Sequence, residues 1–432
     1  MERIVVVGGG AGGLELATRL GRRLGRKKKA HITLVDKNNT HLWKPLLHEV
    51  AAGSLDSDLD ELNYRGHAKA KGFHFAQGAL ESIDREQGEI VLAPLTDSDG
   101  QVVLHSRRLA YDRLVLAVGS VTNDFGIEGI AEHCQFLDSP QQAERFHQRL
   151  LNAFLSLDER AANDRNACLN VAIVGGGATG VELAAELYNS VQVLSAYDLT
   201  HLSKERLKVT LFEAGPRLLP ALPERIANNV HQQLQQLGVD VRVNAAVKGA
   251  TAGQLQVGDE GLAADLMVWA AGIKAPQFLA ELPGLQTRRN NQLVVNSYFQ
   301  TDDERIFALG DCCACPQSPD EPDKFSPPRA QTAHQMASRL GSNLIALNKG
   351  KPMKAFHYVD HGSLVSLSRF SAIGSLMGNR TRSMTIEGKL ARLAYASLYR
   401  MHQKALHGWW RTLLLVLMDR VSHSLRPRLK LH

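Results

Sequence analysis

The chain has 432 residues, of which 44% are hydrophobic and 22% charged; this is the balance of a globular protein with room for two or three domains, and it argues against long disordered segments. The formal net charge is +6, but the segment from Arg380 to the C-terminus holds eleven Lys and Arg residues against Glu387 and Asp419, so this tail carries +9 and the rest of the chain about −3. Five cysteines without a secretory leader argue against a disulfide framework, and no run reaches the ~18 apolar residues of a membrane span.

The N-terminal residues form the pattern Gly8-x-Gly10-x-x-Gly13. The apolar run 4–7 precedes it and predicts a strand, and a predicted helix follows it. In such a unit the first glycine makes a tight turn, the second leaves room for a pyrophosphate, and the third lets the helix pack on the strand. Asp36, at the end of the next predicted strand, stands where a carboxylate would bind a ribose hydroxyl. The pattern therefore predicts a bound dinucleotide.

A second copy, Gly175-x-Gly177-x-x-Gly180, lies in the middle of the chain behind its own apolar strand. Glu213 ends the strand that follows, although it lies further on than the usual ~20 residues, so we place an insertion at about 191–205. A carboxylate at this position would repel a 2′-phosphate, which favours NADH over NADPH. Two such units predict two dinucleotides bound at once, one passing electrons to the other.

Other apolar strands end in glycine near these units. A buried strand ends at Gly119, another ends at Gly272, and each is predicted to close one nucleotide-binding half where a bulky side chain would collide with a cofactor. Between them, residues 141–160 predict a helix. A later short strand ends in Gly310-Asp311, which resembles the sugar-chain-binding signature of two-dinucleotide-domain FAD reductases. The resemblance implies that Asp311 binds the ribityl chain of FAD and that the FAD domain is discontinuous.

Two further segments resemble those of type II NADH:quinone oxidoreductases, the non-pumping, single-subunit respiratory enzymes. The segment 40–50 resembles their flavin-flanking segment, and 329–335 matches their Ala-Gln-x-Ala-x-Gln motif. The resemblance covers essentially the whole chain and implies non-covalent FAD, NADH and a membrane quinone as acceptor. The further residues that it implies at the FAD site are Lys44, Pro45, Leu46 and Ala330.

The same resemblance implies roles for three polar residues. Gln331 and Gln335 lie four apart, so they would share one face of a helix and line a quinone pocket; taken alone, they could equally be exposed glutamines. Glu182 follows the second glycine turn and resembles a family glutamate proposed to act near flavin and quinone in proton transfer or charge sensing. The other reading is an acid that complements a helix N-terminus, and both stay open.

The basic tail is also amphipathic. At helical spacing, an apolar face opposes Lys404, Arg411 and Asp419, as in helices that lie among anionic headgroups. This tail matches the monotopic anchor of the family, which places the protein on the cytoplasmic face of the inner (plasma) membrane. Alternatively, the helix packs on the core or on a second subunit, as in a homodimer. The apolar face consists of Leu406, Trp409, Trp410, Leu413, Leu414, Leu417 and Val421.

The cysteines exclude more than they suggest. No cysteine precedes Cys134, so the redox-active pair of disulfide reductases is missing from the first domain. Cys312 and Cys315, with Cys313 between them, form a C-x-x-C that could be a redox pair or a soft-metal site, but packed thiols are the favoured interpretation. No second ligand pair completes a zinc site, and none of the 17 histidines has metal or triad spacing. We expect no metal and no nucleic-acid partner.

Together these patterns predict an α/β protein with two Rossmann-like domains and a C-terminal amphipathic helical anchor. The expected divisions are an FAD-binding domain over 1–125, an NADH-binding domain over 165–288, a return to the FAD domain over 289–345, and a membrane-associating region over 346–432. Residues 316–328 are expected to form a loop, and 356–364 a strand and turn. The alternatives are a sulfide:quinone oxidoreductase and a flavoprotein resembling apoptosis-inducing factor, which would use the same domains for redox-gated partner binding.

Overall fold

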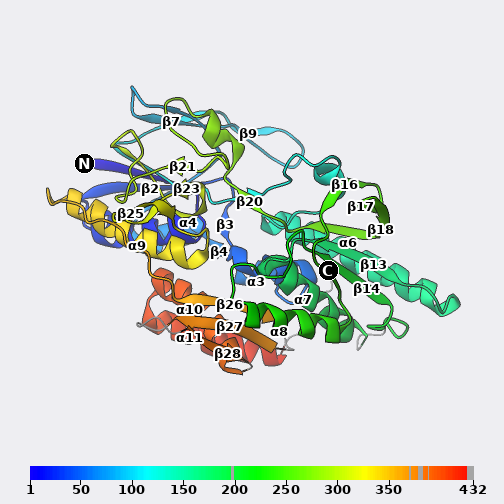
Figure 1. The fold of residues 1–432 in the computed structure, drawn as a ribbon. Helices are drawn as coiled ribbons and strands as arrows, with labels where there is room; N and C mark the ends of the chain where they lie inside the picture. Colours follow the sequence, from blue (N-terminus) through cyan, green and yellow to red (C-terminus); the bar gives the residue numbers. More distant parts are fainter. Residues whose placement is uncertain (196–198, 369–370, 378–382, 388, 426–432) are drawn as a thin grey trace.

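A computed structural model describes residues 1–432 apart from 196–198, 369–370, 378–382, 388 and 426–432. Two parallel sheets form the centres of two α/β domains, and the C-terminal segment, orange to red, lies as a third layer along one side of both (Figure 1). The arrangement agrees with the expected fold class. The basic residues 380, 382, 426, 428 and 430 of the tail lie outside the described part of the chain.

The first sheet has the order β22-β11-β1-β2-β5, and all its neighbours are parallel. The β-branched run at the N-terminus forms its central strand, and helix α1 (Ala11–Leu20) follows directly, as the glycine pattern predicts. The edge strand β22 reaches this sheet from beyond the second domain, as a discontinuous first domain requires. The strands are β1 (Glu2–Val7), β2 (Ala30–Asp36), β5 (His74–Gln77), β11 (Arg113–Leu116) and β22 (Ile306–Ala308).

The second sheet repeats this order as β15-β14-β13-β19, again all parallel. Helix α7 (Ala178–Leu194) connects the first two strands along the chain. The expected insertion is therefore partly helix, because α7 continues to Leu194 before the chain reaches β14. The strands are β13 (Leu169–Val174), β14 (Leu207–Phe212), β15 (Asp240–Arg242) and β19 (Leu266–Trp269).

Shorter elements surround the two sheets. Helix α6 (Pro140–Asn163) leads into the second domain and covers the predicted helix 141–160. The other helices are α2 (Leu47–Ala52), α3 (Ser57–Asp60), α4 (Tyr64–Lys71), α5 (Ile130–His133), α8 (Glu224–Leu237) and α9 (Ala330–Leu347), with η1 (Gly21–Gly25), η2 (Lys44–Leu46), η3 (Gln277–Glu281) and η4 (Gly310–Cys312) as single tighter or wider turns. The antiparallel strands are β3 (Thr40–His41), β4 (Leu62–Asn63), β6 (Leu80–Asp84), β7 (Glu89–Leu92), β8 (Leu95–Thr96), β9 (Val102–Leu104), β10 (Arg107–Ala110), β12 (Val121–Thr122), β16 (Val247–Thr251), β17 (Gln254–Val257), β18 (Glu260–Ala263), β20 (Ile273–Lys274), β24 (Pro316–Ser318) and β25 (Glu321–Phe325), and the parallel pair β21 (Leu293–Val294) and β23 (Cys313–Ala314) completes the set.

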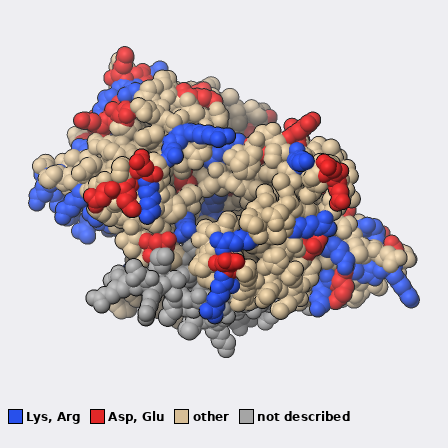
Figure 2. All heavy atoms as spheres, in the orientation of Figure 1, with Lys and Arg blue, Asp and Glu red and all other residues tan. Residues whose placement is uncertain are grey.

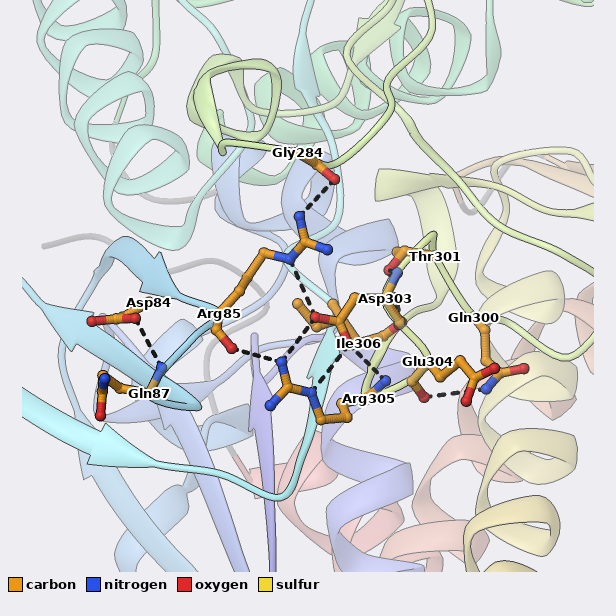
Figure 3. Close-up of polar contacts among 10 residues, drawn as sticks. All are labelled: Asp84, Arg85, Gln87, Gly284, Gln300, Thr301, Asp303, Glu304, Arg305 and Ile306. Carbon is orange, nitrogen blue, oxygen red and sulfur yellow. Dashed lines mark hydrogen bonds and ion pairs between the residues drawn. The ribbon is translucent and has the colours of Figure 1, made fainter.

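An arginine cluster fixes the segment that returns to the first sheet. Arg85, in the turn between β6 and β7, donates from Nε to Asp303 Oδ2 at 3.2 Å and from Nη1 to the carbonyl of Gly284 at 3.0 Å (Figure 3). Arg305 Nη2 in turn donates to the carbonyl of Arg85 at 2.6 Å. Asp303 is largely buried, so hydrogen bonds from both guanidinium groups are needed to satisfy its carboxylate. The cluster holds the start of β22, and with it the following Gly310-Asp311 turn.

The apolar core is shared across the domain boundary. Leu47 and Val50 of α2, in the first domain segment, are buried in one cluster with Phe146 of α6 and Leu183 of α7. Val365 of the C-terminal sheet belongs to the same cluster. Helix α2 therefore joins the two nucleotide-binding units and the C-terminal layer, so that the segments around it have fixed relative positions.

The C-terminal layer is a three-stranded antiparallel meander followed by two helices: β26 (Gly362–Leu367), β27 (Ser371–Met377), β28 (Ser383–Glu387), α10 (Lys389–His407) and α11 (Trp409–Leu425). Gly408 separates the helices with φ +88°, a left-handed conformation that ends a helix. The expectation of one apolar face from Leu406 onward is therefore wrong at its first residue. Leu406 is 2% exposed and packs in the core, and the exposed apolar face begins beyond Gly408. Val421 lies where side chains are not described. Within the described residues, no helix is both long and apolar enough to cross a bilayer.

Two smaller expectations also need correction. Residues 316–328 contain the hairpin β24–β25 rather than only a loop, because alternate backbone groups pair across the Asp320 turn despite the prolines. Residues 356–361 have no regular structure, and the strand begins at Gly362. The backbone of this irregular segment is held by Gln335 of α9 at Val359 and by the carbonyl of Gln317 in β24 at Tyr358.

Candidate functional site

The first glycine turn has the shape that a pyrophosphate needs. Gly8 has φ +104°, and a Cβ there would overlap the backbone of Ala117. A Cβ on Gly13 would overlap the carbonyl oxygen of Gly8, so only glycine lets α1 pack this closely on β1. Gly10, which caps α1, has no atom within 4 Å of the position of a Cβ. The space beside the free N–H groups of the helix N-terminus fits a phosphate group.

The second turn repeats this geometry. Gly175 has φ +116°, and a Cβ on Gly180 would overlap the carbonyl oxygen of Gly175. A Cβ on Gly177 would again meet no atom within 4 Å. Glu213 lies beside this turn, where its carboxylate accepts hydrogen bonds from the backbone N–H of Gly176 at 2.8 Å and of Gly215 at 2.7 Å. Gly272 bounds the same turn, with φ +64°. These residues have the geometry of a dinucleotide-binding turn with a carboxylate beside it.

Asp36 has the matching position in the first domain. Its carboxylate accepts from Gly9 N–H at 2.6 Å and from Asn38 N–H at 2.8 Å. Burial raises the pKa of Asp36, and the two N–H donors partly offset this rise. A carboxylate held beside the glycine turn can accept a hydrogen bond from a ribose hydroxyl.

The residues implied at the flavin end also converge. Asp311 accepts from the Ser120 hydroxyl at 2.9 Å, and burial raises the pKa of this carboxyl. Lys44 donates to the Ser120 carbonyl at 2.8 Å and lies 3.4 Å from Asp138 Oδ1. Gly119 and Gly310 have φ +71° and +79° and therefore need glycine. The loop after β11 and the turn after β22, 191 residues apart in sequence at Ser120 and Asp311, thus form one polar cluster.

A cavity of about 260 Å³ lies between the first domain and α10. It brings together four residues that the sequence predicted, Pro45, Leu46, Ala330 and Gln331. The side chains that complete its wall are Glu15, Trp43, Glu49, Leu55, Asp60, His334, Leu398, Tyr399, Arg400, Met401 and His402. A wider, open hollow of about 810 Å³ around Arg85 holds none of the predicted residues. Most of the smaller cavity's wall is apolar or aromatic with a few convergent polar groups, as in small-molecule sites.

The two glutamines have different surroundings. Gln331 lines the cavity, and its amide donates to the carbonyl of Gly362 at 2.9 Å. Gln335 does not line the cavity: its amide donates to the Val359 carbonyl at 2.7 Å and accepts from the Val359 N–H at 3.0 Å. Its amide is therefore used to hold the irregular segment before β26, which corrects the expectation that both amides face a common substrate.

Glu182 is buried at the junction of three units. Its Oε1 accepts from the N–H of Ser366 in β26 at 3.0 Å, and its Oε2 lies 3.6 Å from Nδ1 of His48 in α2. Burial lowers the pKa of His48 to about 4, so this imidazole is neutral at pH 7. The Glu182 carboxylate links the second domain to the C-terminal sheet. An acid that only complemented the N-terminus of its own helix would not make these contacts with other elements.

The cysteines have the packed environment that was favoured. Cys312, Cys313 and Cys315 are free and buried, and burial raises the pKa of Cys312 to about 11 and of Cys315 to about 12. Such thiols are protonated at pH 7 and poor nucleophiles. Within the described residues, no group of three or more His, Cys, Asp or Glu could hold a metal ion.

Sequence reasoning missed four polar side chains of the cavity region: Glu15, His41, His334 and His402. Glu15 is 7% exposed, and the signal that could have found it is an acid inside the apolar helix start Leu14-Glu15-Leu16. The histidines had no such signal, because 319 and 387 residues separate Glu15 from His334 and His402. Only the packing of α1, α9 and α10 brings them together.

Comparison with known proteins gives this geometry a family. The family model for pyridine nucleotide-disulphide oxidoreductases matches residues 2–337. A type II NADH:quinone oxidoreductase of Haemophilus influenzae is 48% identical over 447 aligned positions, which cover all of both chains. The chain belongs to the type II NADH:quinone oxidoreductase family. This membership confirms the predicted fold class, the enzyme class, and FAD and NADH as cofactors.

Solved structures agree on the fold. NDH2 of Plasmodium falciparum in complex with NADH matches with a TM-score of 0.81 at 19% identity, covering 99% of this chain and all of that one. The sulfide:quinone oxidoreductase of Aquifex aeolicus matches with a TM-score of 0.70, also at 19% identity, covering 94% of this chain and 92% of that one. The fold alone therefore does not separate the two activities, whereas the full-length identity to the family does.

Proposed function

We propose that the chain oxidises NADH at the second glycine turn, takes up the electrons in FAD bound at the first, and reduces a membrane quinone in the cavity between α9 and α10, without pumping protons. Bound FAD supplies the two-electron carrier. The observation that carries the proposal is the cavity itself, which joins the flavin-flanking Pro45 and Leu46 to Ala330 and Gln331 of the motif helix.

The chain's own residues hold and orient the reactants. The N-termini of α1 and α7 bind the two pyrophosphates, and Asp36 and Glu213 bind ribose hydroxyls. Asp311 holds the sugar chain of FAD, and Lys44 fixes the loop that bounds it. Gln331 binds the backbone of Gly362 and closes one side of the quinone cavity. Holding the rings in contact accounts for much of the rate.

A stopped-flow experiment tests the whole sequence of steps. NADH should bleach the flavin absorbance of the purified protein, and a short-chain quinone should restore it rapidly. Bleaching by sulfide but not by NADH would support the sulfide:quinone alternative. Slow reoxidation by every quinone would support the binding-protein alternative.

The nucleotide preference is tested at Glu213. Replacing its carboxylate in Glu213→Ser removes the charge that repels a 2′-phosphate, so kcat/KM for NADPH relative to NADH should rise about tenfold or more, the effect of ~1.4 kcal/mol. Glu260→Ser, at an exposed position in β18, is the matched control. An unchanged preference would remove Glu213 from the ribose site.

The remaining part of the proposal is attachment to the cytoplasmic face of the membrane through α11. Trp409 and Trp410 are 71% and 82% exposed, and Leu413, Leu414, Leu417 and Met418 are exposed large apolar side chains on the same helix. Large exposed apolar surfaces mark interaction sites. Lys404 Nζ lies 5.1 Å from the centre of the Trp409 ring, so a cation accompanies the aromatic side chains as at a headgroup layer.

Basic side chains surround the start of this helix. Arg22 Nη2 donates to the carbonyl of Leu406 at 2.6 Å. Burial, together with the nearby charges of Arg22, Arg411 and Arg26, lowers the pKa of Lys71 to about 8, so its ammonium is still mostly charged at pH 7. This concentration of positive charge beside the exposed tryptophans supports anionic lipid as the occupant, and a second copy of the chain is the alternative that the membrane test distinguishes.

A further inference from the structure

A buried carboxylate with two imidazoles forms part of the cavity wall. Glu15 on α1 is 7% exposed. Its Oε2 lies 2.6 Å from Nδ1 of His334 on α9, and its Oε1 lies 2.7 Å from Nδ1 of His402 on α10. All three side chains line the cavity assigned to quinone. His334 is the accessible member, with 34% of its side chain exposed against 2% for His402.

The hydrogen bonds of His41 determine where a proton must reside. Nδ1 of His41 lies 2.9 Å from the carbonyl oxygen of Gly9, which can only accept, so Nδ1 carries the proton. His41 is neutral, because burial and the neighbouring His402 lower its pKa to about 3. Its Nε2 is therefore an acceptor, and Nε2 of His402, 2.9 Å away, must donate to it.

This orientation leaves one proton shared between His402 and Glu15. With its Nε2 protonated, His402 is either an imidazolium beside a Glu15 carboxylate or a neutral ring that accepts a proton from the Glu15 carboxyl. Burial alone would raise the pKa of Glu15, but hydrogen bonds from His334 and His402 outweigh it and lower the pKa. The lowered pKa favours the Glu15 carboxylate, which is placed to accept hydrogen bonds from both rings.

We propose that His334 is the proton donor to quinone and that Glu15 is the positioning residue that holds its imidazole oriented and protonated. This inference rests on the proposed quinone cavity. NADH is the source of the two electrons that quinone takes up. As quinone takes them up, the Nε2–H bond of the His334 imidazolium breaks and one O–H bond forms on a quinone oxygen, and solvent supplies the second proton that completes the quinol. The Nδ1–H group of His334 stays hydrogen-bonded to Glu15, so the ring ends as the neutral tautomer with its proton on Nδ1. Solvent in the cavity then returns a proton to Nε2.

The charges around His334 favour this role. The hydrogen bond that His334 donates to Glu15 raises the pKa of His334, although burial and the charge of Arg19 on α1 oppose the rise. The other charged groups of the cavity wall are Glu49, Asp60 and Arg400. Burial raises the pKa of Glu49 to about 8, so this carboxyl is mostly neutral at pH 7. Glu15 is thus the carboxylate in direct contact with His334.

Glu15→Gln tests the inference because it keeps the size and removes the charge. Bleaching of the flavin by NADH should keep its wild-type rate, whereas reoxidation by a short-chain quinone should slow about 10- to 100-fold at pH 7.5. In the wild type, the raised pKa keeps the donor protonated to higher pH. The pH at which reoxidation falls to half should therefore be lower in Glu15→Gln than in the wild type. Glu132→Gln, at an exposed position in α5, is the control.

A second variant separates chemistry from tethering of the helices. His334→Gln removes the donor from a partly exposed position and should slow reoxidation to the same extent, and the double variant should be no slower than either single one. Additive losses, or an unchanged pH profile in Glu15→Gln, would overturn the inference, as would equal losses in bleaching and reoxidation. If wild-type protein is not reoxidised by quinone at all, the quinone site itself fails rather than the donor.

Discussion

At the scale of residues, the glycines within each nucleotide site have different roles, and the division is the same in both sites. Gly13 and Gly180 are required by the fold, because a Cβ at either would overlap the backbone of the preceding turn. A Cβ added to Gly10 or Gly177 would meet no atom within 4 Å, so the fold itself does not need glycine there. The space that they leave is explained by a ligand that approaches the backbone closely.

This difference makes a prediction for Gly177→Ala and Gly180→Ala. Gly177→Ala should leave flavin content and the midpoint of thermal unfolding unchanged and raise the Kd of NADH about tenfold or more, because the methyl group occupies space meant for the pyrophosphate. Gly180→Ala should lower the thermal midpoint by several degrees, since a ΔΔG of ~1 kcal/mol shifts it by about 2–4 °C in a large domain. NADH titration and calorimetry measure the two effects. Equal behaviour of the two variants would contradict this division.

At the scale of elements, the C-terminal helices have separate tasks. Helix α10 presents His402 and Leu406, each 2% exposed, to the first domain. Beyond Gly408, α11 presents tryptophan and leucine to the surroundings. The turn at Gly408 lets the chain leave the core, so the element that lines the quinone cavity leads directly into the element proposed to lie in the membrane.

The division of α10 from α11 predicts that membrane binding can be removed without loss of flavin chemistry. Trp410→Ser combined with Leu414→Ser should weaken binding to vesicles with anionic lipid more than tenfold, because each large apolar side chain contributes roughly 1.5–3 kcal/mol on burial. Deletion of the residues after Gly408 should release the protein while NADH still bleaches the flavin. Leu155→Ser, at a position 56% exposed on α6, is the control. Unchanged vesicle binding with a changed oligomeric state would instead assign this face to a second copy.

At the scale of the whole molecule, charge is divided between body and tail. The face drawn in Figure 2 carries Lys and Arg interspersed with Asp and Glu over the described residues. The full sequence assigns about −3 to the body and +9 to the tail from Arg380 onward. With such a distribution, an anionic surface attracts the tail and not the body, which favours one orientation of the molecule.

The charge division predicts a salt dependence confined to the membrane step. Binding to anionic vesicles should weaken strongly between 0.1 and 1 M salt, as the Debye length falls from about 10 to about 3 Å, and binding to zwitterionic vesicles should change little. Vesicle sedimentation at increasing salt measures this, with NADH bleaching as the internal control. Salt-independent binding to anionic vesicles would show that apolar contacts alone hold the protein there.

The amino-acid sequence by itself determined the two nucleotide turns. Gly8 to Gly13, Asp36 and their counterparts around Gly175 act within single strand–turn–helix units, so local spacing is enough to predict them. The sequence also predicted that the chain returns to the first domain at Gly310-Asp311, but this prediction came from resemblance to a family motif and not from local spacing. It predicted the helical register of Gln331 and Gln335 but not their partners Gly362 and Val359, because those lie 31 and 24 residues further along the chain.

Tertiary structure alone decided how the quinone side is built. It turned Gln335 onto the backbone of Val359, placed Leu406 in the core, and brought Glu15 to His334 and His402 from α9 and α10. The physical reason is that helix packing, unlike a turn, depends on complementary surfaces contributed by distant parts of the chain. A buried acid in an apolar helix signals that it needs a partner, but only the folded chain shows which one.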